Sequence, residues 1–332
     1  MKLRTLPSFA LSAIVALALV LSGCSGGGGS GSSVFVPPPG AGPLVYVTDS
    51  GNAILEFSAA ATGNTAPLAQ IAGGNTGLDS AGAIARDSTG RIFVGQQNEN
   101  QVVAFSSTVT GNAGALLSLT GSNTQLSVPA GLAFDGTGRL VVANAGNNSV
   151  TFYAAASLNG NVAPVATISG SNTGLSVPDG VRFDSGGNLY VSNFQANSVT
   201  VYAAGSLTGN VAPIRTISGA ATGLNAPAAL WVTGAGVVYV TNGSGNSITV
   251  FGAGANGNAA PSATISGSNT LLSVPEGIVL DGSGNIYVAD FGQPGFAGAI
   301  EVFAPSANGN VAPTQYIAGP STGLQGTIGV SL

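Results

Sequence analysis

The chain repeats itself every 48 to 52 residues, and this period constrains its fold more than any other feature. A Gly-Asn pair marks each copy, and an aliphatic residue two positions before another glycine recurs at nearly the same spacing. Each copy is therefore expected to be one supersecondary unit that buries its apolar surface against its neighbours. The glycines of the Gly-Asn pairs are Gly63, Gly111, Gly160, Gly209, Gly257 and Gly309.

Each repeat contains four short β-rich segments and no segment with helical periodicity. In one copy these segments are residues 180–184, 188–192, 198–202 and 213–217, with Gly- and Asn-rich turns between them. Such turns are typical of β-hairpins, and four strands per repeat are typical of a propeller blade. The sequence predicts an all-β fold, a six-bladed β-propeller of four-stranded blades over residues 43–332.

The two ends of the repeat region predict how the ring closes. Residues 44–71 supply only three strands of the first blade. Gly323-Leu324 and Gly329-Val330 match Gly174-Leu175 and Gly180-Val181, so the C-terminal residues form a spare innermost strand. We expect this strand to pair beside Leu44–Thr48 and to leave no open sheet edge between the ends.

An uncharged apolar run precedes the repeats and predicts export. It extends from Leu6 to Leu21, behind Lys2 and Arg4, and suits either a cleaved secretory signal or a short membrane anchor. Residues 24–42 that follow are rich in Gly, Ser and Pro, and we expect them to form a tether.

The tetrapeptide Leu21-Ser22-Gly23-Cys24 distinguishes between these two interpretations. It resembles the lipobox of bacterial lipoproteins, which implies a signal peptide over residues 1–23 and lipid attachment to Cys24. Ser25 after this cysteine implies, by the same resemblance, sorting to the outer membrane of the cell envelope. The expected propeller is thus anchored to a membrane and faces the periplasm or the cell surface.

The composition excludes several function classes. Only 6% of residues are charged, none is histidine, and the chain has seven basic against twelve acidic residues. A protein that binds nucleic-acid phosphates needs clustered cations, and the absence of histidine excludes His-dependent chemistry such as that of streptogramin lyase-like propellers. We expect a monomer that binds an envelope protein or a glycan and no nucleic acid, and that needs no cofactor.

Several segments resemble NHL-type propeller repeats, most clearly residues 274–281 and 284–290. This resemblance extends over residues 43–332 and implies the six-bladed propellers of the gluconolactonase-like superfamily. It is specific for the fold, whereas function has to be inferred from the site, because one fold carries many functions.

Asp179 and Glu276 are the best candidates for a site, because their counterparts in the other blades are small or apolar. Both begin an innermost strand at the channel mouth, two blades apart. Val177-Pro178-Asp179-Gly180 resembles the Pro-Asp-Gly segment of gluconolactonase-like lactonases, which implies a divalent cation such as Ca²⁺ at Asp179. Glu276 does not match the family's glutamate by motif, but its equivalent position two blades on makes it the candidate second ligand. In the alternative interpretation, both carboxylates are merely solvated at the mouth.

Other polar residues recur from blade to blade and are expected to be structural. One set ends the second strand of each blade, where its side chains are expected to accept backbone N–H bonds in the following turn. A further set of aspartates, Asp87, Asp135, Asp184 and Asp281, leads into hairpins. The first set consists of Asp49, Gln96, Asn144, Asn193, Asn242 and Asp290.

Three further departures from the repeat are notable. Arg182 interrupts an innermost strand, and its expected counterparts in the other blades are Ala85, Ala133, Leu230, Val279 and Ser331. It is expected to form either an ion pair with Asp179 or Asp184 or a clamp for an anion. The sixth blade has an insertion after Asp290 with Phe291 and Phe296, which either forms a contact surface or packs on the next blade. Trp231 is expected in the core.

The sequence favours a non-catalytic binding scaffold, with Asp179, Arg182, Glu276, Asp290, Phe291 and Phe296 as candidate ligand-binding residues. The alternative is a metal-dependent, lactonase-like hydrolase whose site lies at the channel mouth.

Overall fold

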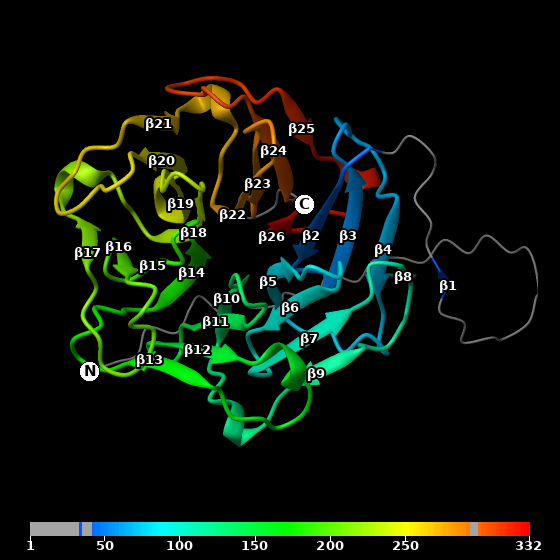
Figure 1. Cartoon of the computed structure of the whole chain (residues 1–332). Coiled ribbons are helices and arrows are strands. Elements are labelled where there is room, and N and C mark those ends of the chain that lie inside the picture. Colours follow the sequence, from blue (N-terminus) through cyan, green and yellow to red (C-terminus); the bar gives the residue numbers. More distant parts are fainter. Residues whose placement is uncertain (1–32, 35–41, 293–297) are drawn as a thin grey trace, which may run out of the picture. The chain divides into compact units, whose positions relative to one another are not determined.

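Six four-stranded antiparallel sheets surround a central axis and form a β-propeller (Figure 1). The computed structural model describes residues 33–34, 42–292 and 298–332. The predicted signal peptide 1–23, Cys24 and Phe296 lie outside these residues. In the described part no helix is long and apolar enough to cross a membrane.

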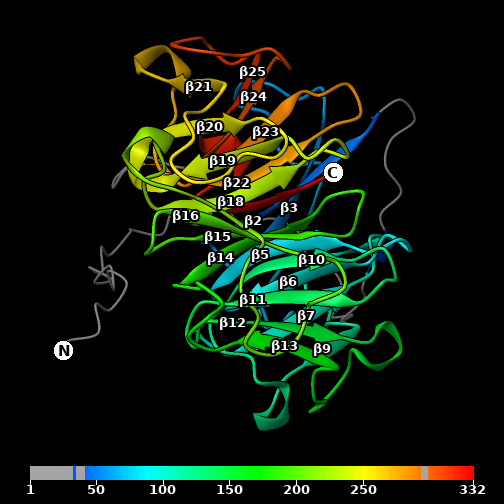
Figure 2. The same ribbon diagram turned by 60° about the vertical axis from the view of Figure 1, so that its left-hand side comes forward.

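The predicted six-bladed, all-β fold is confirmed. Each blade runs outward from an innermost strand at the channel to an outermost strand at the rim (Figure 2). In that order the strands are β26 (Thr327–Ser331), β2 (Leu44–Asp49), β3 (Ala53–Ser58) and β4 (Ala69–Ala72) in blade one; β5 (Ala81–Arg86), β6 (Ile92–Gln96), β7 (Gln101–Phe105) and β9 (Leu117–Leu119) in blade two; β10 (Pro129–Phe134), β11 (Leu140–Asn144), β12 (Ser149–Tyr153) and β13 (Ala166–Ser169) in blade three; β14 (Pro178–Phe183), β15 (Leu189–Asn193), β16 (Ser198–Tyr202) and β17 (Arg215–Ser218) in blade four; β18 (Pro227–Val232), β19 (Val238–Asn242), β20 (Ser247–Phe251) and β21 (Ala263–Ser266) in blade five; and β22 (Pro275–Leu280), β23 (Ile286–Asp290), β24 (Ala299–Phe303) and β25 (Gln315–Ile317) in blade six.

A few short elements lie outside the blades. Strand β1 (Ser33–Val34) pairs with β8 (Val109–Thr110). The remaining elements are single 3-10 turns, η1 (Ser122–Thr124), η2 (Ala155–Ser157), η3 (Ala220–Thr222), η4 (Gly243–Gly245), η5 (Ser268–Thr270) and η6 (Pro320–Thr322).

Ring closure follows the sequence-based prediction. Strand β26 pairs with β2, with Val330 opposite Val47 and Thr327 opposite Asp49. The C-terminal strand thereby completes blade one beside the channel (Figure 1). Pairing on both sides of β2 removes the open edge that three strands alone would leave.

The asparagine of each Gly-Asn pair joins its blade to the preceding one. Asn112 Oδ1 accepts the N–H of Asn75 at 2.7 Å, and Asn64 Oδ1 accepts that of Ser321 at the same distance across the closing point. Backbone bridges such as Gly63 to Ile317 accompany these bonds. The residues that reveal the repeat in the sequence are therefore those that hold one blade to the next.

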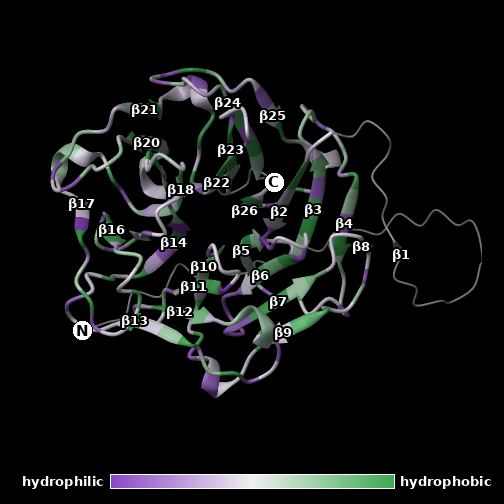
Figure 3. Ribbon diagram, viewed as in Figure 1, coloured by the Kyte–Doolittle hydropathy of each residue, from purple (hydrophilic) through white to green (hydrophobic). Residues whose placement is uncertain are grey.

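The core lies between neighbouring blades. Apolar residues run along the strands, and hydrophilic residues gather in the connecting loops (Figure 3). Val141 and Ala143 of blade three, for example, belong to one buried cluster with Leu189 and Val191 of blade four. Because the stacked sheets bury apolar side chains on both faces, the second and third strands are buried along almost their whole length.

Candidate functional site

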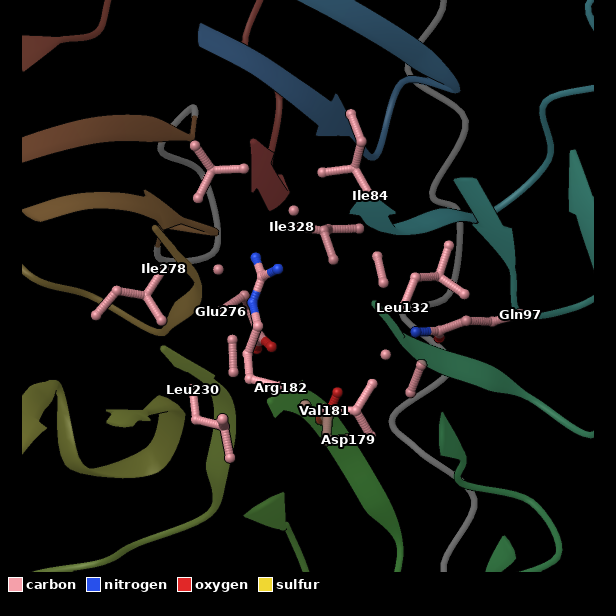
Figure 4. A pocket seen from close by; sticks show the side chains of 18 residues that line it. Ile84, Gln97, Leu132, Asp179, Val181, Arg182, Leu230, Glu276, Ile278 and Ile328 are labelled. Atoms are coloured by element: carbon pink, nitrogen blue, oxygen red, sulfur yellow. The ribbon is translucent and has the colours of Figure 1, made fainter. Parts of the chain in front are cut away.

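The six innermost strands enclose a small central cavity of about 90 Å³ (Figure 4). Glycine, alanine and aliphatic residues form most of its wall. Among the described residues that line it, Asp179, Arg182 and Glu276 are the only charged ones. The structure thus brings together in one cavity three residues that the sequence singled out separately.

Close backbone packing keeps this channel narrow. A Cβ atom added to Gly131 would lie 1.9 Å from the carbonyl oxygen of Asp179, and one added to Gly277 would lie 2.7 Å from that of Ile328. Neighbouring innermost strands therefore approach so closely that these positions require glycine. The resulting cavity is well below the roughly 300–1,000 Å³ of a typical small-molecule site.

Asp179 and Glu276 both follow a proline at the start of an innermost strand and are partly exposed to the cavity. Burial raises the pKa of Asp179 to about 6. Burial, together with repulsion from Asp179 and Asp290, raises the pKa of Glu276 to about 8. Near neutral pH Asp179 is mainly ionised and Glu276 mainly protonated, so the pair presents one acceptor and one donor.

The residues present do not fit a catalytic divalent cation. Hard cations take six or more oxygen ligands, and here two carboxyl groups face the cavity. No group of three or more His, Cys, Asp or Glu side chains with metal-binding geometry occurs in residues 42–292 and 298–332. The implied Ca²⁺ set of Asp179 and Glu276 is thus not completed by further acidic ligands.

The amides that end the second strands do not supply further ligands, because they are engaged within each blade. Asn144 Oδ1 accepts the N–H of Ser127 at 3.1 Å, and its Nδ2 donates to Thr151 Oγ1 at 2.9 Å. Asn193 and Asn242 make the same two bonds. The predicted structural role is confirmed, but the backbone donors lie in the loop before the innermost strand, which the antiparallel pairing places beside the end of the second strand.

The hairpin aspartates also have the predicted structural role. Asp135 Oδ1 accepts the N–H groups of Thr137 and Arg139, and its Oδ2 pairs with the Arg139 guanidinium at 2.6 Å. Asp87 makes equivalent bonds. The carboxylate oxygens of these aspartates thus form their hydrogen bonds within the turn that they stabilise.

The structure corrects both the register and the expected partner of Arg182. Arg182 lies opposite Tyr190, and Trp231 lies opposite Tyr239 at the same place in blade five, so the counterpart of Arg182 is Trp231 and not Leu230. The Arg182 guanidinium carbon lies 4.3 Å from the centroid of the Trp231 ring, a cation–π arrangement. Trp231 is partly buried and also packs against apolar clusters of blades one, five and six.

The expected ion pair of Arg182 does not form within the described residues. Their salt bridges are those of Arg91 and Arg139. Asp184 is occupied by its own hairpin, where it accepts from Gly186 and Asn188. Arg182 instead points into the central cavity (Figure 4).

Blade six contains a buried carboxyl pair that sequence analysis missed in part. Asp290 takes the place of Asn144, and Glu301, 1% exposed, takes the place of Thr151 in the strand register. Both carboxyl oxygens of Glu301 are buried without a hydrogen-bond partner among the described residues. A glutamate within the apolar segment Ala299–Phe303 is the sequence signal that would have identified it.

Asp290 is structural on the contacts observed. Its carboxyl oxygens accept the N–H groups of Ser273 and Gly292. Burial outweighs these bonds and raises the pKa of Asp290 to about 7. The pKa of Glu301 is raised well above its usual range, first by burial and then by repulsion from Asp290.

Phe291 packs onto the neighbouring blade. A Cβ atom added to Gly326, in the loop before β26, would lie 2.9 Å from Phe291 Cε2. Phe291 is partly exposed, so its ring covers the closing loop with one side. This contact places the beginning of the insertion beside the closing strand.

Comparisons with known proteins agree with this architecture. A family model described as "SMP-30/Gluconolactonase/LRE-like region" matches residues 29–236. No curated protein matches the chain.

Solved structures show the same fold at low sequence identity. A protein of unknown function from Bacteroides caccae is 11% identical with a TM-score of 0.63, over 86% of this chain and 97% of that one. Virginiamycin B lyase from Staphylococcus aureus is 13% identical with a TM-score of 0.54, over 91% and 94%. A protein from Lactobacillus plantarum is 17% identical with a TM-score of 0.54, over 75% and 73%.

Proposed function

The chain belongs to the SMP-30/gluconolactonase/LRE-like family, and we propose that within this family it is a non-catalytic binding scaffold anchored to the bacterial cell envelope. The observation that carries this proposal is the channel mouth. It offers two carboxyl groups, a cavity of about 90 Å³, and neighbouring amides already engaged in hydrogen bonds. Such a site lacks the ligand set and the volume of a substrate pocket.

The near-uniform blades support the same role. Most of the recurring polar residues form hydrogen bonds within a blade, as Asn144 does, or between neighbouring blades, as Asn112 does. A binding surface then has to come from the departures from the repeat. We propose that the face carrying Asp179, Glu276 and Phe291 binds an envelope protein or a glycan.

The second candidate is a lactonase-like hydrolase. The family match favours it, as does the pairing of an ionised Asp179 with a protonated Glu276 near neutral pH. One group would accept a proton and the other would donate one, as general acid–base catalysis requires. A lactone held at the mouth, outside the cavity, is the substrate this arrangement would take.

Metal analysis and lactone hydrolysis by the whole purified chain separate the two functions. The scaffold predicts no bound divalent cation, no change of melting temperature with chelator, and no lactone hydrolysis. Lactone hydrolysis that Asp179→Ala abolishes, while the hairpin variant Arg139→Gln retains it, would establish the hydrolase instead, and metal analysis would then show whether it is metal-dependent.

Capture of envelope proteins and glycans tests the proposed face. Asp179→Ala/Glu276→Ala and Phe291→Ala/Phe296→Ala should each weaken whatever binding the parent shows, and Arg139→Gln should not. Binding that persists in full in both double variants would place the partner elsewhere.

The membrane anchor has its own test. In a detergent phase-separation experiment, Cys24→Ser should move the protein from the detergent to the aqueous phase. Membrane-bound protein that still begins at Met1 would contradict lipid attachment at Cys24.

A further inference from the structure

Three of the five arginines from Arg86 onward have a hydrogen-bonding partner, and a fourth, Arg86, acts electrostatically on Glu56. Arg91 and Arg139 form ion pairs of 2.7 and 2.6 Å with hairpin aspartates. Arg215 donates to Tyr190 at 2.8 Å, and Arg86 lies over the Tyr46 ring within the electrostatic influence of Glu56. Each of these four arginines thus interacts with a carboxylate or a tyrosine hydroxyl.

Arg182 is different. Within the described residues its guanidinium forms no ion pair, and its recorded contact is the face of Trp231. Burial alone lowers its pKa to about 10, with no opposing contribution from a neighbouring carboxylate. A guanidinium has five N–H donors in a planar fork, and a partly desolvated cation of this kind requires an anion or water.

We propose that Arg182 and Trp231 form a binding site for a small monocarboxylate anion inside the central channel. The planar fork of a guanidinium matches a carboxylate through two parallel hydrogen bonds. Trp231 supports the guanidinium from its face, so that its N–H edges remain available. This site does not depend on the scaffold role, because its ligand lies within the channel rather than on the face of the propeller.

The wall of the cavity limits the rest of the ligand. Leu230, Ile278 and Val330 line it together with glycines and alanines, so a carboxylate with a short alkyl group is favoured over a polar one. The volume of about 90 Å³ holds only a few water-sized groups. A chain of two to four carbons, as in acetate or propionate, is the class that fits.

The acidic residues of the same cavity form no salt bridge with Arg182 among the described residues. Asp179 lies three residues earlier on β14, across an irregularity in the β14–β15 register between Pro178 and Val181. Glu276 is the second residue of β22, as Asp179 is of β14. Burial raises the pKa of both acids, and repulsion from Asp179 and Asp290 raises that of Glu276 further, so neither carboxyl group is held in its ionised form by Arg182.

Trp231 is the only tryptophan in the chain, so its fluorescence reports on this site directly. We expect a saturable change when the whole chain, in a non-ionic detergent at pH 7.5, is titrated with sodium acetate or propionate at constant ionic strength. Sodium chloride and phosphate should give a weaker response. Arg182→Gln should weaken carboxylate binding at least tenfold, Arg182→Lys by less, and Arg139→Gln not at all.

Thermal melting provides the second readout. Propionate should raise the melting temperature of the parent and of Arg139→Gln, but not that of Arg182→Gln. A fluorescence response that is linear, equal for all salts, or retained in Arg182→Gln would overturn the proposal. If Arg182→Gln does not fold, the absence of carboxylate-specific stabilisation of the parent would overturn it equally.

Discussion

Blades three to five and the seam between blades six and one differ in the side chains that connect the end of the second strand to the third strand. In blades three to five, an asparagine at the end of the second strand donates to a threonine on the third, as Asn144 does to Thr151. At the seam, Asp290 and Glu301 occupy these two places. An amide and a hydroxyl offer both donors and acceptors, whereas two ionised carboxylates offer only acceptors.

The comparison shows that a blade can keep the same strand geometry while the side chains at these two positions change from neutral groups to carboxyl groups, of which at least one has to be protonated. Two buried carboxyl groups that influence each other cannot both be ionised at low cost, so the folded state favours a proton on the pair. Thr327 Oγ1 donates to the backbone oxygen of Asp290, which connects the pair to the closing strand β26. The stability of the seam should therefore respond to pH through this carboxyl pair, in addition to the pair Asp179 and Glu276 at the channel mouth.

The largest expected effect comes from removing the seam itself. Deletion of Thr327–Leu332 exposes the edge of β2 and opens the ring. We expect a loss of several kcal/mol, out of a typical total of roughly 5–15 kcal/mol. Chemical denaturation should show it, with removal of Leu332 alone as the control. A melting temperature within a degree or two of the parent would contradict closure by β26.

A reciprocal exchange of the two chemistries sharpens the comparison. Asp290→Asn/Glu301→Thr gives blade six the pair of the other blades and should stabilise the domain at pH 8 by about 2 kcal/mol, as replacement of buried ionic groups often does. Asn144→Asp/Thr151→Glu should destabilise blade three by a similar amount. Equal stability of all three proteins in urea at pH 8 would show that the pair has no energetic consequence.

The pH dependence of stability should have a specific sign. Asp179, Glu276 and Asp290 have folded pKa values of about 6, 8 and 7, and those of Glu56 and Glu301 are also raised. The folded state thus holds protons that the unfolded state releases, and stability should fall as pH rises from about 4.5 to about 8. The decline should be shallower in Asp290→Asn/Glu301→Thr.

The hairpin aspartates determine at which low pH the stability of the domain begins to decrease. For Asp87, burial acts to raise the pKa, but hydrogen bonds from Thr89 and Arg91 outweigh it and lower the pKa. Asp135, Asp184 and Asp281 behave alike. Their contribution is lost as pH falls below about 4, so melting curves should locate maximum stability near pH 4–5. A maximum above pH 7 would refute the assigned shifts.

The smallest expected effect concerns the bonds between neighbouring blades. Asn197 has a positive φ of 47°, and its Oδ1 accepts the N–H of Ala226 at 2.7 Å. Asn197→Gly keeps this backbone conformation and removes only the acceptor, so it should cost about 1 kcal/mol. The insertion in blade six contains no asparagine for this bond. There the Phe291 ring contacts the loop before β26 instead, and the loss of stability in Phe291→Ala measures the contribution of that contact. Thermal melting distinguishes the two variants.

The fold could be predicted from the sequence because the repeat specifies it six times. Residues 198–202 are β16 as predicted, whereas the segment predicted to begin at Pro213 begins as β17 at Arg215. Closure by the C-terminal strand followed from a count of strands in the first blade.

The site was less predictable because it depends on contacts between blades. Nearness in sequence suggested an ion pair for Arg182, but the Asp184 carboxylate is occupied by its hairpin, and Trp231 lies on the adjacent strand β18. The Asp290–Glu301 pair depends on the register between β23 and β24, which places Glu301 opposite Val288. The identity of a single residue in the sequence does not reveal which residue of a neighbouring strand or blade lies opposite it.

Closure by β26 also affects how the chain folds during synthesis. The hydrogen bonds that seal blade one join residues 276 to 281 positions apart. At roughly 5–20 residues per second, β26 is made about 15 to 60 seconds after β2. For that time the apolar segment Leu44–Asp49 has an unpaired edge, which is a template for aggregation. Ring closure thus becomes a late event that has to wait for β26, and a chaperone that holds this edge would act in the interval before it.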